Sequence, residues 1–404
     1  MRQFLLLALR NVFRNRRRTV MTMLIVAVGV AALILSGGFF VYMFRELAEG
    51  TIRFGIGHLQ IFSTAALTGS ERHAMEHGLD RYREILSVAR RVPHVRGAAP
   101  RITFFGMVSN GPKSDTFMAT AVDPLAESRM GFTLRILYGR GLAQDSDVLV
   151  ADGLARSMNV KPGDTLKLLA VTTSGALNAL DAKVAGIYTV GMREVDDYAL
   201  RLTVDASQRL LRTDRVTMVV VGLDATANTD AAYTALLAAL GHRRDLAIRK
   251  WVDLATFYRQ CLGLFNGIFA FSGVIVFFMV VMSSANTMMM SMFERTREIG
   301  AMLAMGTRRS WILALFVTEG LVTGVLGAVT GVVSGLVIGA LLNRSGLELP
   351  PPPATDAPLP FRVVFSPGIV LGASILVILT LVIASLAPAI RASRLKIVEA
   401  LAHV

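Results

Sequence analysis

The stretch FERTREIGAMLAMGTRRSWILALFVTEG, residues 293–320, decides the fold of this chain. Its first part, residues 293–310, is short, charged and amphipathic, and a long apolar run lies on each side of it. Two apolar runs joined this closely leave no room for a separate domain between them. The stretch therefore predicts two membrane-spanning helices joined by a short helix that acts as a lever, rather than part of a pore.

Four runs in the chain are long and apolar enough to cross a membrane, since about 20 apolar residues span roughly 30 Å of hydrocarbon. The composition agrees, with 53% hydrophobic and 18% charged residues. The predicted fold class is membrane α-helical with four transmembrane helices, plus an extracytoplasmic α+β domain inserted between the first two helices. The predicted segments are a cytoplasmic interfacial helix (1–19), transmembrane helix 1 with the start of a stalk (20–45), a periplasmic α+β domain of two lobes (46–260), transmembrane helix 2 (261–292), a cytoplasmic coupling helix (293–310), transmembrane helix 3 (311–342), a short periplasmic loop (343–366), transmembrane helix 4 (367–390) and a cytoplasmic tail (391–404).

The distribution of basic residues orients these spans by the positive-inside rule. Both termini are predicted to be cytoplasmic and residues 46–260 to lie outside the cytoplasm. A cleavable signal peptide is the rival interpretation of the N-terminus, but its apolar region is about 7–15 residues, shorter than the first run here. The basic residues are Arg2, Arg10, Arg14, Arg16, Arg17 and Arg18 before the first span, Arg295, Arg297, Arg308 and Arg309 between the second and third, and Arg391, Arg394 and Lys396 after the fourth.

The net charge of +13 does not indicate nucleic-acid binding, because much of the excess lies at the predicted membrane boundaries. There each basic residue attracts anionic headgroups by about 1 kcal/mol, so membrane lipids are expected partners and nucleic acid is not. For residues 1–19, a flexible basic tail is the alternative to an interfacial helix. The single cysteine, Cys261, excludes a disulfide within the chain, so the outer domain depends on its core for stability.

Residues 46–260 alternate between strand and helix patterns separated by glycine and proline turn signals. One lobe is expected from residues 57–117 with the segment after residue 217, and the other from residues 123–215. Residues 44–53 and 251–260 are expected to continue the neighbouring spans outward as helical stalks. Strands are expected at 148–150, 165–169, 184–188 and 216–221, and helices at 79–91, 205–212 and 229–240.

The third span contains a ridge of glycines at four-residue spacing, Gly327, Gly331, Gly335 and Gly339. Small residues at this spacing let another helix approach closely, so the ridge predicts helix packing. The packing partner is either a helix of the same chain or one of a second subunit. Glu319 lies inside the same apolar run, where an ionisable group generally has a partner or a function. An ion pair with an arginine at the cytoplasmic end of a neighbouring helix is predicted, in preference to a proton relay.

Sequence patterns for catalysis are missing from the chain. It has neither the phosphate-binding loop G-x-x-x-x-G-K-[ST] nor the zinc-protease motif H-E-x-x-H. His73 and His77 lie four residues apart beside Glu76, but a polar, exposed helix explains this spacing better than a metal site. The chain is therefore predicted to be non-catalytic, without a metal site or a bound cofactor. The polar residues within the spans are predicted to form interhelical hydrogen bonds: Asn266, Ser283, Ser284 and Asn286.

Motifs at both ends of the chain resemble those of one family. Residues 294–309 are similar to the pattern E-R-T-x-E-I-G-x-x-x-A-x-G-x-x-R, and the intramembrane Glu319 follows them. Residues 388–401 resemble a terminal P-x-x-R-A…VEAL signature, and residues 8–18 resemble an A-L-R-N…R-x-R opening. The chain thus resembles the FtsX, MacB and LolC/LolE type of ABC transporter permease.

Within the insert, residues 160–165 and 184–196 resemble the lipoprotein-releasing LolC/LolE branch more than the macrolide-exporter branch. Subunits of the LolC type carry a long hairpin that holds the periplasmic lipoprotein carrier. The comparable segment here, residues 172–181, is short and lacks a proline-rich tip. The resemblance to LolC therefore does not extend to this hairpin, and the alternatives are a LolE-like role and a homodimeric role.

The resemblance implies a permease subunit of the bacterial inner membrane that works with a second permease subunit, identical or paralogous. It also implies two copies of a separate ABC ATPase, which would bind ATP and Mg. ATPase motion would change the outer domain without moving a substrate through the membrane centre. The residues implied to couple to the ATPase are Glu294, Arg295, Thr296, Arg297, Glu298, Ile299, Gly300, Met302, Leu303 and Gly306, with the apolar side chains of Ile299, Met302 and Leu303 seated in a groove of the ATPase.

The implied activity is extraction of lipoproteins or another lipidic substrate from the outer leaflet, with a periplasmic carrier or adaptor as a further partner. Within the family, the alternatives are efflux of peptides or drugs with a periplasmic adaptor, and regulation of a cell-wall hydrolase. Outside the family, a sensor would need a cytoplasmic output domain, for which the segment after residue 390 is too short. A membrane-embedded enzyme would need clustered catalytic side chains, which the spans lack.

Overall fold

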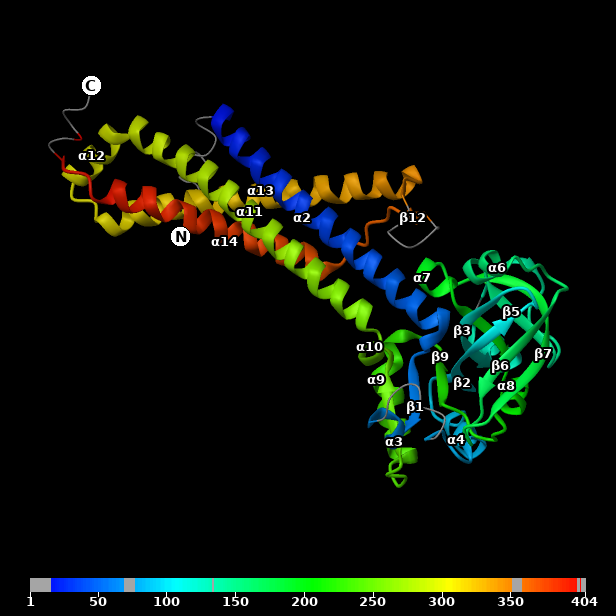
Figure 1. The fold of residues 1–404 in the computed structure, drawn as a ribbon. Coiled ribbons are helices and arrows are strands. Elements are labelled where there is room, and N and C mark those ends of the chain that lie inside the picture. The colour runs from blue at the N-terminus through cyan, green and yellow to red at the C-terminus, as the bar shows by residue number, and fades with distance from the viewer. Residues whose placement is uncertain (1–15, 69–76, 133, 351–357, 398–399, 401–404) are drawn as a thin grey trace. The chain divides into compact units, whose positions relative to one another are not determined.

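The computed structural model describes residues 16–68, 77–132, 134–350, 358–397 and 400. The chain divides into two compact units (Figure 1). The helical unit comprises residues 1–45, 261–349 and 360–404, and the sheet unit comprises residues 46–260 with 350–359. Residues 1–15 of the expected interfacial helix, His73, Glu76 and part of the C-terminal motif lie outside the described residues, and residues 16–19 begin α2.

Four helices among the described residues are long and apolar enough to cross a membrane, as predicted. They lie side by side in Figure 1, and a shared apolar core joins Val26 and Val30, Val280, Ala328 and Val377, with at least one residue from each helix. The helical elements are α2 (Arg16–Thr51), α11 (Thr256–Glu294), α12 (Thr296–Ala304), α13 (Arg309–Ser345) and α14 (Pro367–Ser393), and the short strands β11 (Glu348–Leu349) and β12 (Leu359–Pro360) pair between α13 and α14.

The sheet unit contains a ten-stranded mixed sheet in which β6 pairs with β2 and β7 beside the main path β10-β1-β9-β2-β3-β8-β5-β7-β4. Strands from both of the expected lobes join this one sheet. The strands are β1 (Leu59–Ser63), β2 (Val95–Ser109), β3 (Ser114–Val122), β4 (Arg135–Gly139), β5 (Asp147–Ala151), β6 (Thr165–Val171), β7 (Leu177–Thr189), β8 (Ala199–Thr203), β9 (Met218–Leu223) and β10 (Leu246–Lys250). The helices are η1 (Ile52–Ile56), α3 (Thr64–Thr68), α4 (Tyr82–Ala89), α5 (Pro124–Met130), α6 (Asp152–Met158), α7 (Arg193–Asp196), α8 (Val204–Leu211), η3 (Thr226–Asn228), α9 (Thr229–Leu240) and α10 (Trp251–Leu254).

Alternation of side chains along the strands explains how this sheet holds a core on each face. In β5, Val148 and Val150 face a large core that also contains residues of α4, α6, α8 and α9. Leu149 and Ala151 face the opposite side, where they pack with Tyr188. Both kinds of residue are buried, so β5 is a central strand.

The elements expected from sequence periodicity in this unit are confirmed, with α9 spanning residues 229–240 as expected. The expected helical continuation of the first span beyond residue 44 is also confirmed, because α2 continues to Thr51. The expectation of one continuous helix from Trp251 is corrected. Ala255 has non-helical angles (φ −82°, ψ 71°), so α10 is a separate turn and α11 begins at Thr256.

Candidate functional site

The charged stretch between the second and third long helices folds as α12, set off from both neighbours by a bend. At its start, Arg295 leaves the helical conformation (φ −112°, ψ 12°), and its carbonyl accepts the Ile299 N–H at 2.9 Å. At its end, Gly306 adopts φ +86°, which a residue with a side chain rarely tolerates. The predicted helix and its glycine stop are therefore both present.

The apolar side of α12 packs against helices of the same chain. Ile299 and Leu303 are 2% and 9% exposed, and they share a core with Met292 of α11, Ile312 of α13 and Ala389 of α14. This corrects the expectation that these side chains seat in a groove of an ATPase, because their apolar surface is already covered. Burial of this face instead attaches α12 to three long helices.

Other residues of the predicted coupling set divide between the inner and outer sides of α12. Thr296 and Gly300 are buried, and the Thr296 hydroxyl donates to the Met292 carbonyl at 3.1 Å. Met302 is partly buried at the edge of the same core. The residues that the structure leaves exposed on and beside α12 are Phe293, Glu294, Arg297, Glu298, Ala304, Met305, Gly306, Arg308, Arg309 and Ser310.

A buried ion pair connects the start of α12 to α13. Arg295 Nη1 lies 3.0 Å from Glu319 Oε1, and the two side chains are only 12% and 10% exposed. The predicted ion pair is confirmed, and Arg295 is therefore not on the exposed rim where it was expected. A charge-assisted hydrogen bond in apolar surroundings constrains the orientation of both groups. The pair therefore fixes α12 against α13 in addition to the apolar core.

The glycine ridge of α13 packs inside the chain. A methyl group placed at Gly327 would lie 2.5 Å from Val26 Cγ1 of α2, and one at Gly331 would lie 2.6 Å from Val30 Cβ. Such contacts are too short to tolerate a side chain, so the ridge allows α2 and α13 to approach closely. Of the two alternatives left open by the sequence, the structure supports packing within one subunit.

A polar bond between α2 and α11 was not among those expected. The Thr22 hydroxyl donates to the Thr287 hydroxyl at 3.0 Å. Ser284, which was expected to bond a neighbouring helix, is fully buried, and its hydroxyl has no hydrogen-bond partner among the described residues. Sequence reasoning identified the polar region of α11 correctly but not the residue that makes the contact.

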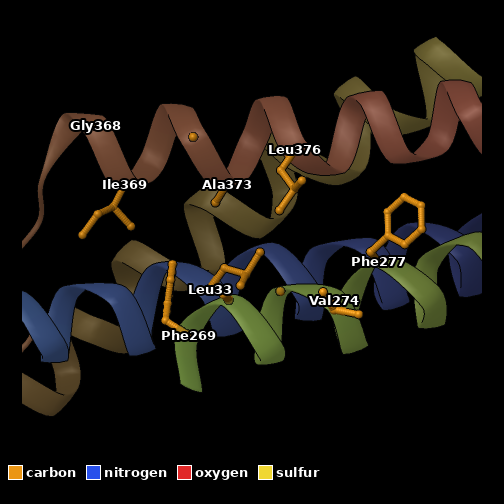
Figure 2. Close-up of a pocket in the computed structure, with 11 residues that line it drawn as sticks. Leu33, Phe269, Val274, Phe277, Gly368, Ile369, Ala373 and Leu376 are labelled. Atoms are coloured by element: carbon orange, nitrogen blue, oxygen red, sulfur yellow. The ribbon is translucent and has the colours of Figure 1, made fainter. Parts of the chain in front are cut away.

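An apolar groove of about 540 Å³ lies between α2, α11 and α14. Figure 2 shows Ile369 and Leu376 of α14 pointing toward Leu33 of α2 and Phe269 of α11 across it. Gly372 also lines the groove, and a methyl group placed there would meet no atom within 4 Å. The groove therefore has space for an apolar chain, but none of its described lining residues has a polar side chain to bind a headgroup.

The sheet unit holds a buried charged cluster that sequence reasoning missed. Arg101 of β2 donates to Glu127 of α5 and to the Gly55 carbonyl in η1, and Arg201 of β8 lies 3.2 Å from the same carboxylate. All three charged residues are less than 10% exposed. Tyr188 lies beside Arg201, and burial raises the pKa of Tyr188 to about 12. The available signal was an arginine between apolar neighbours in each of two strands, with Pro100 and Ile102 beside Arg101, and Leu200 and Leu202 beside Arg201.

Comparison with known proteins identifies the family. Residues 270–397 match the model of the FtsX-like permease C-terminal region, and residues 19–239 match the MacB-like periplasmic core domain. The second match covers more than half of the chain. The chain belongs to the MacB/FtsX-type permease family. This MacB/FtsX-type permease therefore has the coarse architecture expected from its sequence, with four apolar helices and a sheet-rich domain of periplasmic type.

Similar proteins include a LolE protein and several MacB proteins. The lipoprotein-releasing system transmembrane protein LolE of Haemophilus influenzae is 21% identical over 75% of this chain and 72% of its own length. The macrolide export ATP-binding/permease protein MacB of Hyphomonas neptunium is 29% identical over 52% of this chain, and that of Shewanella sp. is 25% identical over 98%. The chain spans only 31% and 60% of these two MacB proteins. The crystal structure of the periplasmic region of MacB from Actinobacillus actinomycetemcomitans matches 52% of the chain with 15% identity and a TM-score of 0.37.

Proposed function

We propose that this permease is the non-catalytic membrane subunit of an ATP-driven mechanotransmitting transporter, and that a separate ATPase docks on the exposed side of α12. The observation that carries the proposal is the attachment of α12. One side of the helix is held by Ile299, Leu303 and the Arg295–Glu319 pair, while charged residues remain exposed on the other. A helix held in this way transmits a push to its neighbours instead of bending away from it.

The proposed cycle is a rigid-body movement driven by differential contacts in two states. Two ATPase subunits would close on ATP and Mg, bound by them and not by this chain, and would displace the α12 of each of two permease subunits. Because α12 packs on α11, α13 and α14, its displacement would move these helices together. The α2 helix runs without interruption from Arg16 to Thr51, which belongs to the sheet unit, and so gives the movement a continuous path along the chain.

The proposed orientation places α12 and both termini in the cytoplasm and the sheet unit in the periplasm, with the helices in the bacterial inner membrane. Exposed Arg297, Arg308 and Arg309 surround α12, and an excess of arginine is typical of cytoplasmic loops. The match to the MacB-like periplasmic core domain covers residues 19–239, which include most of the sheet unit and exclude α12. This match supports the same orientation. Residues 46–260 are accordingly proposed as the periplasmic domain, within the segment boundaries predicted from the sequence.

The proposed substrate is a lipoprotein or another lipid-anchored molecule in the outer leaflet. The similarity to a lipoprotein-releasing protein over three quarters of the chain supports it, as does the apolar groove between α2, α11 and α14. Efflux with a periplasmic adaptor is the second candidate. It is favoured by the similarity to a macrolide export protein over 98% of the chain.

Purification of the tagged full chain in gentle detergent tests the proposal. Met305, which is 79% exposed, is replaced by cysteine in a Cys261→Ser background, and a short crosslinker is added before mass spectrometry. An ATPase crosslinked at position 305, with ATP turnover in the same sample, is expected. Copurified lipoproteins or their carrier would support extraction, whereas an adaptor would support efflux. Absence of any ATPase would contradict the proposed function.

A further inference from the structure

His58 connects three parts of the sheet unit through its backbone and side chain. It lies between η1 and β1 and is 7% exposed. Its N–H donates to the Val221 carbonyl of β9 at 3.0 Å, and its carbonyl accepts the Trp251 N–H at the start of α10 at 3.0 Å. His58 follows η1, which continues from α2, and Trp251 begins α10, which leads to α11. His58 therefore connects both of these segments to β9.

The side chain of His58 forms a directional chain of hydrogen bonds. The Leu223 N–H donates to His58 Nδ1 at 3.1 Å, so Nδ1 carries no proton and the neutral ring holds its proton on Nε2. Nε2 lies 3.3 Å from the Thr226 hydroxyl oxygen, and this hydroxyl donates in turn to Glu49 Oε1 of α2 at 2.8 Å. This series of hydrogen bonds joins the C-terminal end of α2 to the end of β9, and each of its protons has a defined position.

Protonation of the ring is incompatible with this arrangement. A proton on Nδ1 would face the Leu223 N–H, leaving two donors opposed and no acceptor between them. Burial lowers the pKa of His58 below its ordinary value of 6.5, while the carboxylates of Glu49 and Asp224 oppose this effect. Each carboxylate is itself engaged, since Glu49 lies 3.6 Å from Arg53 and Asp224 accepts hydrogen bonds from Asn228 and from the backbone N–H of Ala225.

Charges on the remaining neighbouring elements are also engaged with other groups. On the α10 side, Asp253 accepts the Lys250 N–H at 3.4 Å, and the Lys250 ammonium lies 2.5 Å from Asp230. On the loop after β9, the Asp224 carboxylate lies 3.1 Å from His94 Nδ1. These groups do not accept a hydrogen bond from His58, so a proton added to its ring gains no partner from them.

We propose that His58 is a positioning residue whose neutral ring fixes the outer end of α2 to β9 and η3, and that protonation of the ring releases this joint. The joint is a property of the sheet unit, and only its effect on ATP coupling rests on the proposed function. The direction of the pH effect follows from linkage. Below pH 6.5 the imidazole binds a proton more readily when the joint is open than when it is closed, so acidification favours opening. Above pH 6.5 the joint is fully formed.

Hydrogen exchange of the full chain in detergent tests the joint without an ATPase. For a peptide covering residues 218–228, the opening equilibrium is expected to be larger at pH 5.5 than at pH 7.5, by up to about tenfold, after correction for intrinsic exchange rates. His58→Asn keeps an acceptor for the Leu223 N–H but does not titrate, so this pH dependence is expected to disappear. His242→Asn, at an exposed histidine, is expected to retain it. Equal pH dependence in His58→Asn and the unaltered chain would overturn the proposal.

A spectroscopic measurement keeps the proposal testable if His58→Asn does not fold. In the unaltered chain labelled with ¹⁵N-histidine, His58 is expected to show the tautomer protonated on Nε2 and to titrate below its ordinary value of 6.5. Titration of His58 at or above 6.5, or the opposite tautomer, would overturn the assignment.

The role of the joint in coupling is tested on the complex with its ATPase. Thr226→Val removes the hydroxyl at nearly constant volume and is expected to reduce substrate-stimulated ATP turnover several-fold, while Thr226→Ser restores it. Unchanged stimulation in Thr226→Val would contradict the positioning role in coupling. Failure of the chain to copurify any ATPase would contradict the proposed function instead, and the hydrogen-exchange result would stand independently.

Discussion

Buried charges in the sheet unit depend on one another at the level of single residues. Glu127 is the shared acceptor of Arg101 and Arg201, and all three side chains are at most 10% exposed. Arg101 Nε has no hydrogen-bond partner among the described residues, so Arg101 is not fully satisfied even with Glu127 in place. Removing the single negative charge would leave two buried guanidinium groups facing each other, which costs far more than the loss of an exposed pair.

Glu127→Gln is accordingly expected to destabilise the sheet unit by about 3–5 kcal/mol. For a domain of this size, such a change lowers the melting temperature by at least about 6 °C. Thermal unfolding of the full chain in detergent, followed by tryptophan fluorescence, measures the effect through buried Trp251. Glu194→Gln, at an exposed position of α7, serves as the control. Equal melting temperatures for the two variants would contradict the assigned role of the cluster.

The Arg295–Glu319 pair allows a similar prediction for the attachment of α12. Arg295→Gln and Glu319→Gln each leave one charge in apolar surroundings, so each is expected to cost about 3 kcal/mol. The double variant is expected to cost clearly less than the sum, because the second substitution no longer breaks this pair. Thermal unfolding of the four proteins gives this coupling energy. Additive losses would show that the two groups act independently.

At the scale of helices and strands, periodicity predicted most elements because the local pattern and the tertiary environment agree. The α9 and β5 segments are examples, since their apolar residues face the core that the pattern anticipates. The break at Ala255 was not predictable in this way, because residues 251–260 keep helical spacing on both sides of it. The partner of the glycine ridge was also undetermined, because a small-residue face does not specify which helix it meets.

The segment predicted to couple to an ATPase shows where sequence reasoning reached its limit. The residues 294–306 predicted a short amphipathic helix with a glycine stop, and the structure contains both. The apolar face of such a helix serves equally well for an internal core or for a partner protein. Tertiary packing of Ile299 and Leu303 against α13 and α14 decides between them, and no pattern within the segment contains that information.

Close packing of α13 on α2 predicts a difference between two glycine substitutions. A methyl group at Gly331 would lie 2.6 Å from Val30 Cβ and 2.8 Å from the Ala27 carbonyl oxygen, so Gly331→Ala is expected to cost about 1–3 kcal/mol. Gly267→Ala in α11 meets no atom within 4 Å and is expected to be neutral or slightly stabilising. Their melting temperatures in detergent provide the comparison. Equal values would argue against the observed approach of the two helices.

At the scale of the whole molecule, the proposed function requires α12 and the sheet unit to lie on opposite sides of the membrane. In a Cys261→Ser background, Ala176→Cys in the β6–β7 turn and Met305→Cys beside α12 provide one exposed probe for each side. A membrane-impermeant thiol reagent applied to intact spheroplasts is expected to label position 176 alone. Labelling of position 305 would reverse the proposed topology.

The central claim is that ATPase motion enters this permease through the exposed side of α12. Arg297→Glu reverses a charge there, and Arg135→Glu reverses one on exposed β4 as the matched control. The measurement is ATP turnover by the purified complex, with the amount of copurified ATPase determined in the same samples. Arg297→Glu is expected to lower turnover or ATPase retention about tenfold or more, since opposed like charges at an interface cost several kcal/mol, while Arg135→Glu has no effect. Unchanged turnover and retention in Arg297→Glu would contradict the account.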